Sequence, residues 1–238
     1  MRPTDVTDSR ELSWEGCVNA RDLGGLGRIR RGAVVRMEAP TRLSAAGWTA
    51  AWDYGVRTVL DLRNADECVP DEAQRPPGIT TVRVPLDPVG TPFYERWSRI
   101  DNFASPLYFP AMLAEYPEPV ITAVRAIADA APGCVVFHCS GGKDRTGLLA
   151  LVLLTLAGAK PEDILADYLL SYERMRQLLA ELGIGDQLVA VRELLASHGT
   201  TIEDSLFSTI GSLAMPGFLL GNGLSESELD GLRARLTG

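Results

Sequence analysis

Three segments that follow one another over residues 134–154 most constrain how this chain can fold. The first, residues 134–137, has the length and the β-branched content of a buried strand. The last, residues 148–154, is rich in leucine and lies ahead of Gly158, as is typical of a buried helix and its end. Between them residues 138–147 read His-Cys-Ser-Gly-Gly-Lys-Asp-Arg-Thr-Gly. We therefore predict a strand, a tight loop and a helix.

This arrangement is suited to binding a dianion. Gly141 and Gly142 allow the backbone to curl so that its N–H groups, with that of Ser140, face one concavity. The following helix adds free N–H groups and the positive end of its dipole. Arg145 can grip two oxygens of a phosphoryl group. Cys139 would lie at the floor of this cup, where cations and a helix terminus favour a thiolate, so we expect it to be a nucleophile for phosphoryl transfer.

The loop resembles the Cys-x5-Arg signature of the protein tyrosine phosphatases. The fuller string His-Cys-x-x-Gly-Lys-Asp-Arg-Thr-Gly is similar to that of atypical bacterial tyrosine and phosphoinositide phosphatases. Residues 19–25, 59–63 and 223–225 are similar to further landmarks of that family, so the resemblance spans nearly the whole chain. The family often carries alanine where Gly141 stands, and the extra glycine should loosen the loop slightly.

The resemblance implies a fold and an activity. The fold is α/β, with a central sheet flanked by helices and a mobile helical lid over the site. The activity is hydrolysis of phosphotyrosine, with phosphoserine, phosphothreonine and phosphoinositides as further substrates, through a cysteinyl-phosphate intermediate. We expect no metal and no cofactor, because the arginine and the backbone amides neutralise the charge that Mg²⁺ neutralises in other phosphoryl-transfer sites.

The leaving oxygen needs a proton and the intermediate needs a base. Asp144 is the first candidate, because it lies in the loop and the family resemblance implicates this position. Its competing role is charge balance between its two basic neighbours. Asp61 ranks second, at the end of a predicted strand where ligands bind in open α/β sheets. It could equally hold Arg63. Asp87 ranks third.

Three further residues of the loop also have candidate roles. Lys143 either adds a positive charge at the mouth, which favours substrates with several phosphates, or is a solvent-exposed lysine. Thr146 can donate its hydroxyl to the sulfur of Cys139, begin the helix, or do both. We expect His138 to hold the loop by hydrogen bonds as a structural residue. All three belong to the predicted site, Thr146 and Lys143 as phosphate-binding residues.

Elsewhere, hydrophobic spacing and capping residues predict the remaining elements. Helices are expected over 44–54, 119–130, 161–179, 186–197 and after Ser225, and strands over 57–62 and 81–86, with short strands within 14–38. Residues 64–80, which contain three prolines, should be a surface loop. No linker divides the chain, so residues 1–238 form one predicted domain with a flexible lead-in over 1–13.

Residues 93–116 hold seven aromatic residues and two prolines that interrupt helical spacing. One interpretation is a helical lid inserted over the active site, which the family resemblance also implies. The other is a satellite hydrophobic cluster, because aromatic stripes usually mean packing. An aromatic rim would suit a phosphotyrosine ring or an apolar lipid stem.

The bulk composition excludes several classes of function. A net charge of −8 argues against a nucleic-acid partner. No run reaches the roughly 18 apolar residues of a spanning helix, and the N-terminus does not read as a signal peptide. Four scattered cysteines suit a reducing compartment. We expect a cytoplasmic protein without stable membrane insertion, whose partners are phosphorylated proteins or phosphoinositides; export without a cleaved signal peptide stays open.

Two other functions compete with the phosphatase. A phosphate-recognising pseudoenzyme would bind phosphoproteins without turnover, although Cys139, Asp144 and Arg145 are all present. A thiol-dependent arsenate reductase shares a Cys-x5-Arg loop but needs resolving cysteines. Cys134, in the strand before the loop, should be buried.

Overall fold

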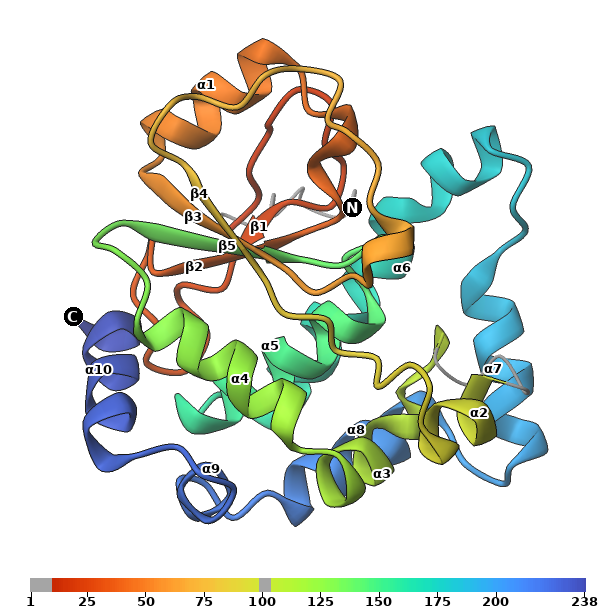
Figure 1. Ribbon diagram of the computed structural model, residues 1–238. Coiled ribbons are helices and arrows are strands. Elements are labelled where there is room, and N and C mark those ends of the chain that lie inside the picture. Colours follow the sequence, from red (N-terminus) through yellow and green to blue (C-terminus); the bar gives the residue numbers. More distant parts are fainter. Residues whose placement is uncertain (1–9, 99–103) are drawn as a thin grey trace, which may run out of the picture.

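Strand β5, Cys134–His138, is the middle of a five-stranded sheet (Figure 1). The computed structural model describes residues 10–98 and 104–238. The strand order is β1-β2-β5-β3-β4. β1 pairs antiparallel with β2, and the other neighbours are parallel. The other strands are β1 Arg21–Asp22, β2 Val34–Met37, β3 Val56–Asp61 and β4 Thr80–Arg83.

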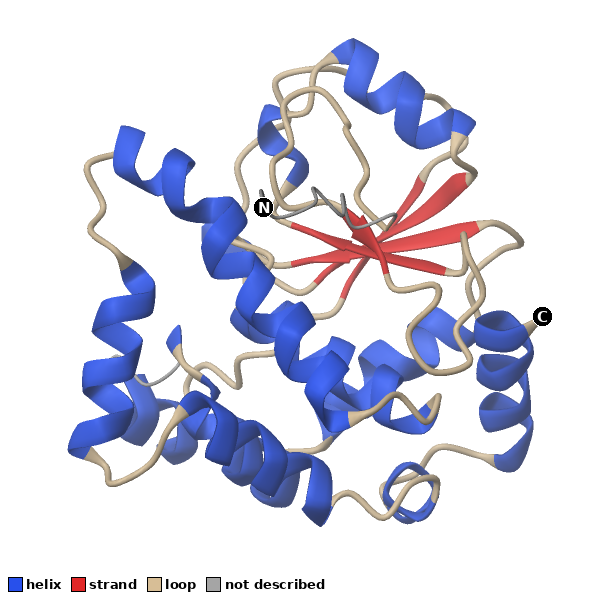
Figure 2. Cartoon of the chain, turned by 180° about the vertical axis from the view of Figure 1, so that it is seen from behind, coloured by secondary structure: helices blue, strands red, loops and turns tan. Residues whose placement is uncertain are grey.

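Helices cover both faces of the sheet (Figures 1 and 2). Helix α1, Ala45–Asp53, lies on one face, and α4, Glu118–Ala128, and α5, Asp144–Leu156, lie on the other. The remaining helices are α2 Pro92–Ser98, α3 Phe109–Glu115, α6 Pro161–Glu181, α7 Gln187–Ser197, α8 Ile202–Ser212, α9 Gly217–Gly221 and α10 Glu226–Thr237. Short 3-10 turns are η1 Pro40–Arg42, η2 Ala65–Glu67 and η4 Pro106–Tyr108. The predicted α/β class with a central sheet flanked by helices is thereby confirmed.

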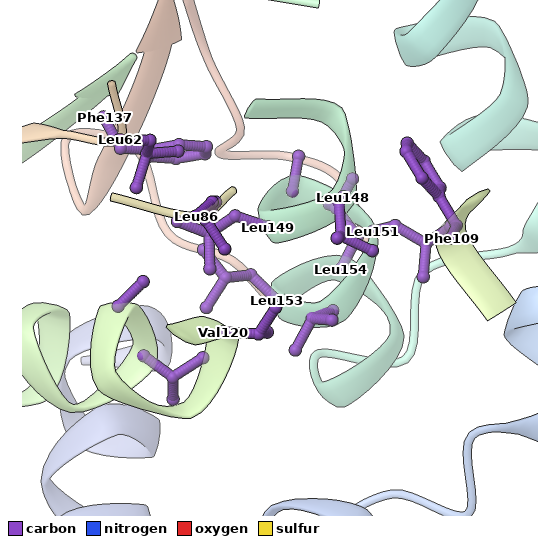
Figure 3. Packing of buried hydrophobic residues seen from close by; sticks show 14 of the residues in the cluster. Leu62, Leu86, Phe109, Val120, Phe137, Leu148, Leu149, Leu151, Leu153 and Leu154 are labelled. Atoms are coloured by element: carbon purple, nitrogen blue, oxygen red, sulfur yellow. The ribbon is translucent and has the colours of Figure 1, made fainter. Parts of the chain in front are cut away.

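The alternation of β5 divides the core in two. Val135 and Phe137 pack toward α5 in the larger cluster, whereas Cys134 and Val136 pack toward α1 in the smaller one. A parallel strand covered on both faces must be apolar throughout, which explains the continuous run in the sequence. Helix α5 is buried nearly all round, and its leucines lie in one cluster with residues of β5, α3 and α4 (Figure 3). The labelled residues are Leu62, Leu86, Phe109, Val120, Phe137, Leu148, Leu149, Leu151, Leu153 and Leu154.

Most predicted elements lie where the sequence places them. Ser44 caps α1 and Asp186 caps α7, each accepting hydrogen bonds from the first helical turn. Ser225 and Glu228 form the predicted capping box of α10. One difference concerns a loop: residues 64–80, expected as a surface loop, contain η2, which reaches the functional site described below. Residues 199–223, for which the sequence predicts no particular element, contain α8 and α9.

The aromatic segment 93–116 is mainly a packing unit. The rings of Phe93, Tyr108 and Phe109 are buried in the large core cluster. Tyr94 instead lines the cavity above the loop, together with Ser98 and Ala104 at the edges of the undescribed stretch 99–103. The segment therefore supplies one wall of the site, and lid motion stays a prediction.

The predicted flexible lead-in lies largely outside the described residues, which begin at Arg10. Arg10 forms an ion pair with Asp167 at 3.0 Å. Glu11 forms an isolated β-bridge with Arg21. The last residues of this segment are therefore held by polar contacts to α6 and β1.

A cluster of buried charges joins β1, β2 and α6. Asp167 on α6 accepts from Arg21 at 2.8 Å and from Arg36 at 2.5 Å, and all three side chains are almost completely buried. Ser171, one turn further along α6, accepts from both arginines at 2.7 and 3.2 Å. Burial by itself would raise the pKa of Asp167, but the two arginines outweigh it and hold that pKa well below its usual range. Asp167 is therefore a carboxylate in the folded protein.

Replacing this carboxylate should destabilise the fold. Asp167→Asn leaves two arginines buried without their counter-charge, and we expect a loss of about 3–5 kcal/mol in the free energy of unfolding at pH 7. The folded-state pKa of Asp167 is depressed, so its contribution is complete above the unfolded pKa of about 3.9 and declines as the pH falls below it. Urea unfolding at pH 7 and pH 3.5 should show a smaller difference between wild type and variant at the lower pH. An equal difference in unfolding free energy at both pH values would contradict the conclusion that Asp167 is a carboxylate in the folded protein.

Candidate active site

The predicted cup lies at the carboxyl end of β5, where α5 begins. Cys139 follows the strand directly and is 4 % exposed. It lies in the wall of a cavity of about 570 Å³. The other lining residues are Glu38, Ala39, Thr41, Arg42, Asp87, Tyr94, Ser98, Ala104, Ser140, Gly141, Lys143, Asp144, Arg145, Met175, Leu178, Leu179, Leu182 and Gln187. The cavity thus combines a polar floor from the loop with an apolar wall from the second half of α6.

The carbonyl groups of the loop are held from outside the cup. The Ser140 carbonyl accepts from the N–H of Ala39 at 2.9 Å, and the Gly141 carbonyl accepts from the side chain of Asn19 at 3.1 Å. The Gly142 carbonyl accepts from Arg36 at 2.8 Å. In a trans peptide the C=O and the next N–H point in opposite directions. The N–H groups of residues 141–143 are therefore turned away from these partners, toward the anion-binding side.

The two loop glycines differ in whether the structure has room for a side chain. Gly142 has φ of +65°, and a Cβ there would lie 2.2 Å from the carbonyl oxygen of Met37. A Cβ on Gly141 would meet nothing within 4 Å. The backbone therefore requires glycine at 142, whereas position 141 has room for alanine.

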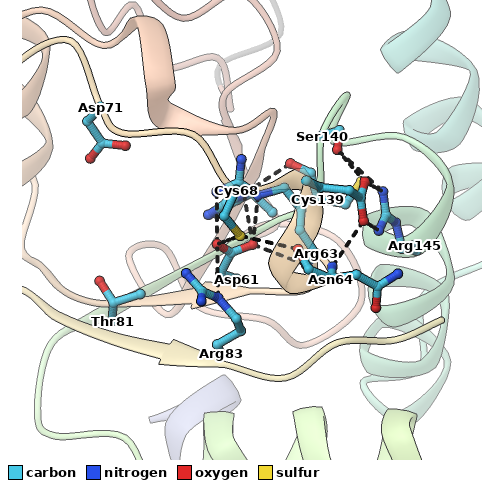
Figure 4. Close-up of polar contacts among 12 residues, drawn as sticks. Asp61, Arg63, Asn64, Cys68, Asp71, Thr81, Arg83, Cys139, Ser140 and Arg145 are labelled. Carbon is cyan, nitrogen blue, oxygen red and sulfur yellow. Dashed lines mark hydrogen bonds and ion pairs between the residues drawn. The ribbon is translucent and has the colours of Figure 1, made fainter. Parts of the chain in front are cut away.

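Arg145 is already engaged by carboxylates. Its two terminal nitrogens bond to Glu67 at 2.5 and 2.6 Å, and Nη1 lies 3.1 Å from Asp87. Glu67 also accepts from the hydroxyl of Ser140 at 2.9 Å. The fork of Arg145 lies beside Ser140 and Cys139 (Figure 4). Arg145 is thus fixed over the cup with its fork aligned for oxyanions.

Asp87 reaches the site because the chain stays beside β3 after β4 ends. The N–H groups of Val84 and Leu86 bond to the carbonyls of Asp61 and Leu62 at 2.9 and 3.2 Å. The following carboxyl group is delivered to the cavity at the carboxyl edge of the sheet. Burial raises the pKa of Asp87 to about 6, even though the nearby Arg145 lowers it. A carboxyl group that is partly protonated near neutral pH therefore faces the reacting centre.

Asp144 is bound differently. Its Oδ1 accepts from the hydroxyl of Tyr168 at 2.8 Å, and its Oδ2 lies 3.2 Å from the ammonium group of Lys143. Lys143 is 6 % exposed, so the interpretation as a solvent-exposed lysine was wrong. The ammonium also donates to the carbonyl of Ala104 at 3.3 Å and lies 4.2 Å from the ring centre of Tyr172.

Asp61 does not lie in the cavity wall. Both of its oxygens accept from the guanidinium of Arg63 at 2.9 Å, so the alternative that it holds Arg63 describes the structure (Figure 4). Burial would raise the pKa of Asp61, but Arg63 lowers it to about 2. A carboxylate that stays ionised at neutral pH is a poor proton donor.

His138 and Thr146 support the loop from within the core. His138 is fully buried, and its Nδ1 lies 3.0 Å from the carbonyl oxygen of Cys139. Burial lowers the pKa of His138 to about 4, so the ring is neutral at pH 7. The hydroxyl of Thr146 is buried without a hydrogen-bond partner among the described residues, so its predicted bond to the sulfur of Cys139 is not formed here.

Two observations bear on redox and metal chemistry. Cys134 faces the α1 side of the sheet, in the core cluster opposite to the one that contains Cys139. It is therefore poorly placed to act as a resolving cysteine. Within residues 10–98 and 104–238, no group of three or more histidine, cysteine or acidic side chains is arranged to hold a metal ion.

No helix in the same ranges is long and apolar enough to cross a membrane.

The sheet order, the helical layers and the cup define an α/β protein with a tyrosine-phosphatase-like fold. The family model for the tyrosine phosphatase family matches residues 12–238, and the chain belongs to that family. As its family and its relatives indicate, it is a protein-tyrosine phosphatase.

Three relatives cover most of the chain. A protein of Cupriavidus necator named as a tyrosine-protein phosphatase is 30 % identical over 84 % of this chain and 79 % of its own length. A tyrosine-protein phosphatase of Nostoc commune is 30 % identical over 86 % of this chain and 74 % of its own. The triple specificity protein phosphatase PtpB of Mycobacterium tuberculosis is 26 % identical over 96 % of this chain and 99 % of its own length.

Sequence reasoning did not identify Glu67 or Arg36 as part of the site. Glu67 lies in a segment that reads as an ordinary polar loop, and only its capping box with Asn64 is readable from the sequence. Arg36 is a charged residue within an apolar strand, which is an unusual position. That burial signal could have marked Arg36, whereas nothing local marked Glu67.

The two glycines provide a matched pair of substitutions. Gly142→Ala should lower kcat/KM by at least about tenfold and reduce stability, because left-handed backbone costs roughly 1–2 kcal/mol for a non-glycine residue and the new Cβ meets Met37. Gly141→Ala should stay within about twofold of wild type, since its Cβ has room. Steady-state kinetics and thermal unfolding of both variants would test this. Equal effects of the two substitutions would show that the described loop backbone is wrong.

Proposed function

We propose that this enzyme hydrolyses phosphotyrosine in proteins through a cysteinyl-phosphate intermediate. The observation that carries the proposal is the position of Cys139 at the floor of a cup whose carbonyls are tied outward and whose rim holds Arg145. Such a cup neutralises a phosphate dianion with backbone N–H groups and one guanidinium. No metal or cofactor enters the proposed reaction.

In the first step the thiolate of Cys139 attacks phosphorus. A sulfur–phosphorus bond forms and the bond from phosphorus to the tyrosine oxygen breaks. Asp87 gives its proton to that departing oxygen, since it is the carboxyl group at the site that burial keeps partly protonated. Arg145 and the loop N–H groups stabilise the charge on the equatorial oxygens. Arg145 would share its fork between the phosphate and Glu67, or release Glu67.

In the second step a water molecule attacks phosphorus and the sulfur leaves as thiolate. The water proton passes to Asp144, whose carboxylate is held by Tyr168 and faces Lys143. Phosphate is then released. This assignment divides between two carboxylates the acid and base work that we assigned first to Asp144 from the sequence, and it leaves Asp61 a structural role.

The cavity also supports a wider substrate range. Lys143 and Arg42 bring positive charge to its wall, which suits a substrate with a second phosphate. Tyr94 and the leucines of α6 provide apolar surface for a phosphotyrosine ring or a lipid stem. The name of the Mycobacterium relative refers to three specificities. We extend the proposal to phosphoserine, phosphothreonine and phosphoinositides on this basis.

The nucleophile is tested by Cys139→Ser. This variant should lose at least about a thousandfold in kcat, because a serine hydroxyl at this site lacks the reactivity of a thiolate. It should still bind a phosphotyrosine peptide, measured by isothermal titration with EDTA present. Retained turnover would refute the cysteinyl mechanism. A wild type that binds the peptide and turns over no phosphate ester would establish the pseudoenzyme instead.

The proton donor is tested by comparing two leaving groups. In Asp87→Asn, kcat/KM should fall about a hundredfold for a phosphotyrosine peptide but less than about tenfold for p-nitrophenyl phosphate, whose leaving group needs little protonation. The donor must be protonated, so wild-type kcat/KM for the peptide should decline as the pH rises above about 6, the pKa of Asp87, and this decline should vanish in the variant. Asp144→Asn should keep the decline. The reverse pattern would make Asp144 the donor.

A further inference from the structure

Helix α6 brings two tyrosine side chains against the loop. Tyr168 and Tyr172 are one helical turn apart, and both side chains are buried. Their hydroxyl oxygens lie 3.3 Å apart. Tyr168 donates to Asp144 at 2.8 Å, while the ring of Tyr172 lies under the ammonium group of Lys143. The two consecutive charged residues of the loop are thus held by consecutive turns of one helix.

The ring of Tyr168 is fixed independently of its hydroxyl. A Cβ on Gly147 would lie 2.8 Å from two atoms of that ring, so the ring packs directly on the first turn of α5. Phe109 and Tyr172 meet the same ring edge to face, with ring centres 6.0 and 5.7 Å away. The hydroxyl is therefore aimed at Asp144 by packing. Burial raises the pKa of Tyr168, so the phenol remains protonated and can donate throughout the working pH range.

The contacts leave the carboxylate of Asp144 competent to accept a proton. Tyr168 uses one lone pair of Oδ1, and Lys143 lies beside Oδ2. An ionised carboxylate offers about four acceptor positions, so others remain for a water molecule. Asp144 also lines the cavity that contains Cys139. A fixed orientation matters there because proton transfer needs hydrogen-bond reach to the attacking water.

We propose that Tyr168 is a positioning residue for hydrolysis of the intermediate: its hydroxyl holds the carboxylate of Asp144 in the orientation that receives the water proton. The inference rests on the proposed function and assigns to α6 a part in the second chemical step. Tyr172 assists by supporting Lys143 and the hydroxyl of Tyr168.

The variant Tyr168→Phe removes the hydroxyl and keeps the ring that packs on Gly147. We expect kcat to fall about tenfold, part of the 10²–10⁴ that a positioned acid or base contributes. For p-nitrophenyl phosphate, kcat/KM should stay within about twofold, because it reports only steps up to release of p-nitrophenol. A rapid burst of p-nitrophenol, equal to the enzyme concentration, should precede the slow steady state.

A matched control removes a similar hydrogen bond elsewhere. Tyr54 donates to Asp22 at 2.5 Å, and neither residue lines the cavity. Tyr54→Phe should have the kcat of the wild type and should not show the burst expected of Tyr168→Phe, even if both variants lose the same thermal stability. A burst in both variants would show a general effect of lost stability and would overturn the proposal.

A double-mutant cycle with Asp144→Asn supplies the decisive comparison. If Tyr168 acts through Asp144, adding Tyr168→Phe to Asp144→Asn should cause no further loss in kcat. Fully additive losses, or an unchanged kcat in Tyr168→Phe, would overturn the inference while the phosphatase proposal stands. Absence of p-nitrophenol release by the wild type would instead refute the proposed function.

If Tyr168→Phe does not fold, a second measurement tests the proposal. Incorporation of 3-fluorotyrosine at position 168 keeps the ring and the donor but makes the phenol more acidic, and so alters its hydrogen bond to Asp144. We expect a changed kcat with kcat/KM for p-nitrophenyl phosphate within about twofold of wild type. A kcat equal to that of the wild type would overturn the proposal.

Discussion

The site depends on the outward attachment of three loop carbonyls. A backbone that curls around an anion must turn its N–H groups inward, and its carbonyls must then find partners on the opposite side. Asn19, Arg36 and Ala39 are those partners. Arg36 can serve only because Asp167 balances its charge in the core. The anion site is therefore connected to the buried ion cluster around Asp167 by two routes: directly through Arg36, and through Arg21, which donates to the side chain of Asn19 at 2.6 Å. The costly burial of charge thus has a structural purpose.

Two carboxyl groups meet the same cavity in different electrostatic surroundings. Burial and the nearby charge of Glu67 raise the pKa of Asp87 to about 6, although Arg145 lowers it. Asp144 instead has a phenol donor and an ammonium group for neighbours. From these contacts we assign the role of proton donor to Asp87 and that of proton acceptor to Asp144. That division underlies the proposed mechanism.

Helix α6 connects support, chemistry and substrate contact. Its first half holds the buried arginines through Asp167, its middle presents two tyrosines to the loop, and its second half forms the apolar wall of the cavity. These contacts fall on one side of a single 21-residue helix. The helical repeat makes this possible, because residues three and four apart share a face. A shift of α6 would therefore alter the loop and the cavity together.

The sequence by itself determined the strand, the loop and the helix around Cys139, because β-branched content, leucine content and glycine positions act over a few neighbouring residues. It also predicted the caps Ser44 and Ser225 and the α/β layering. Only the tertiary structure decided which distant groups complete the site. Glu67 and Asp87 reach Arg145 across 78 and 58 positions of the chain, and the choice between Asp61 and Asp87 depends on burial and on the position of Arg63. Such long-range contacts and desolvation arise from packing, which no local pattern encodes.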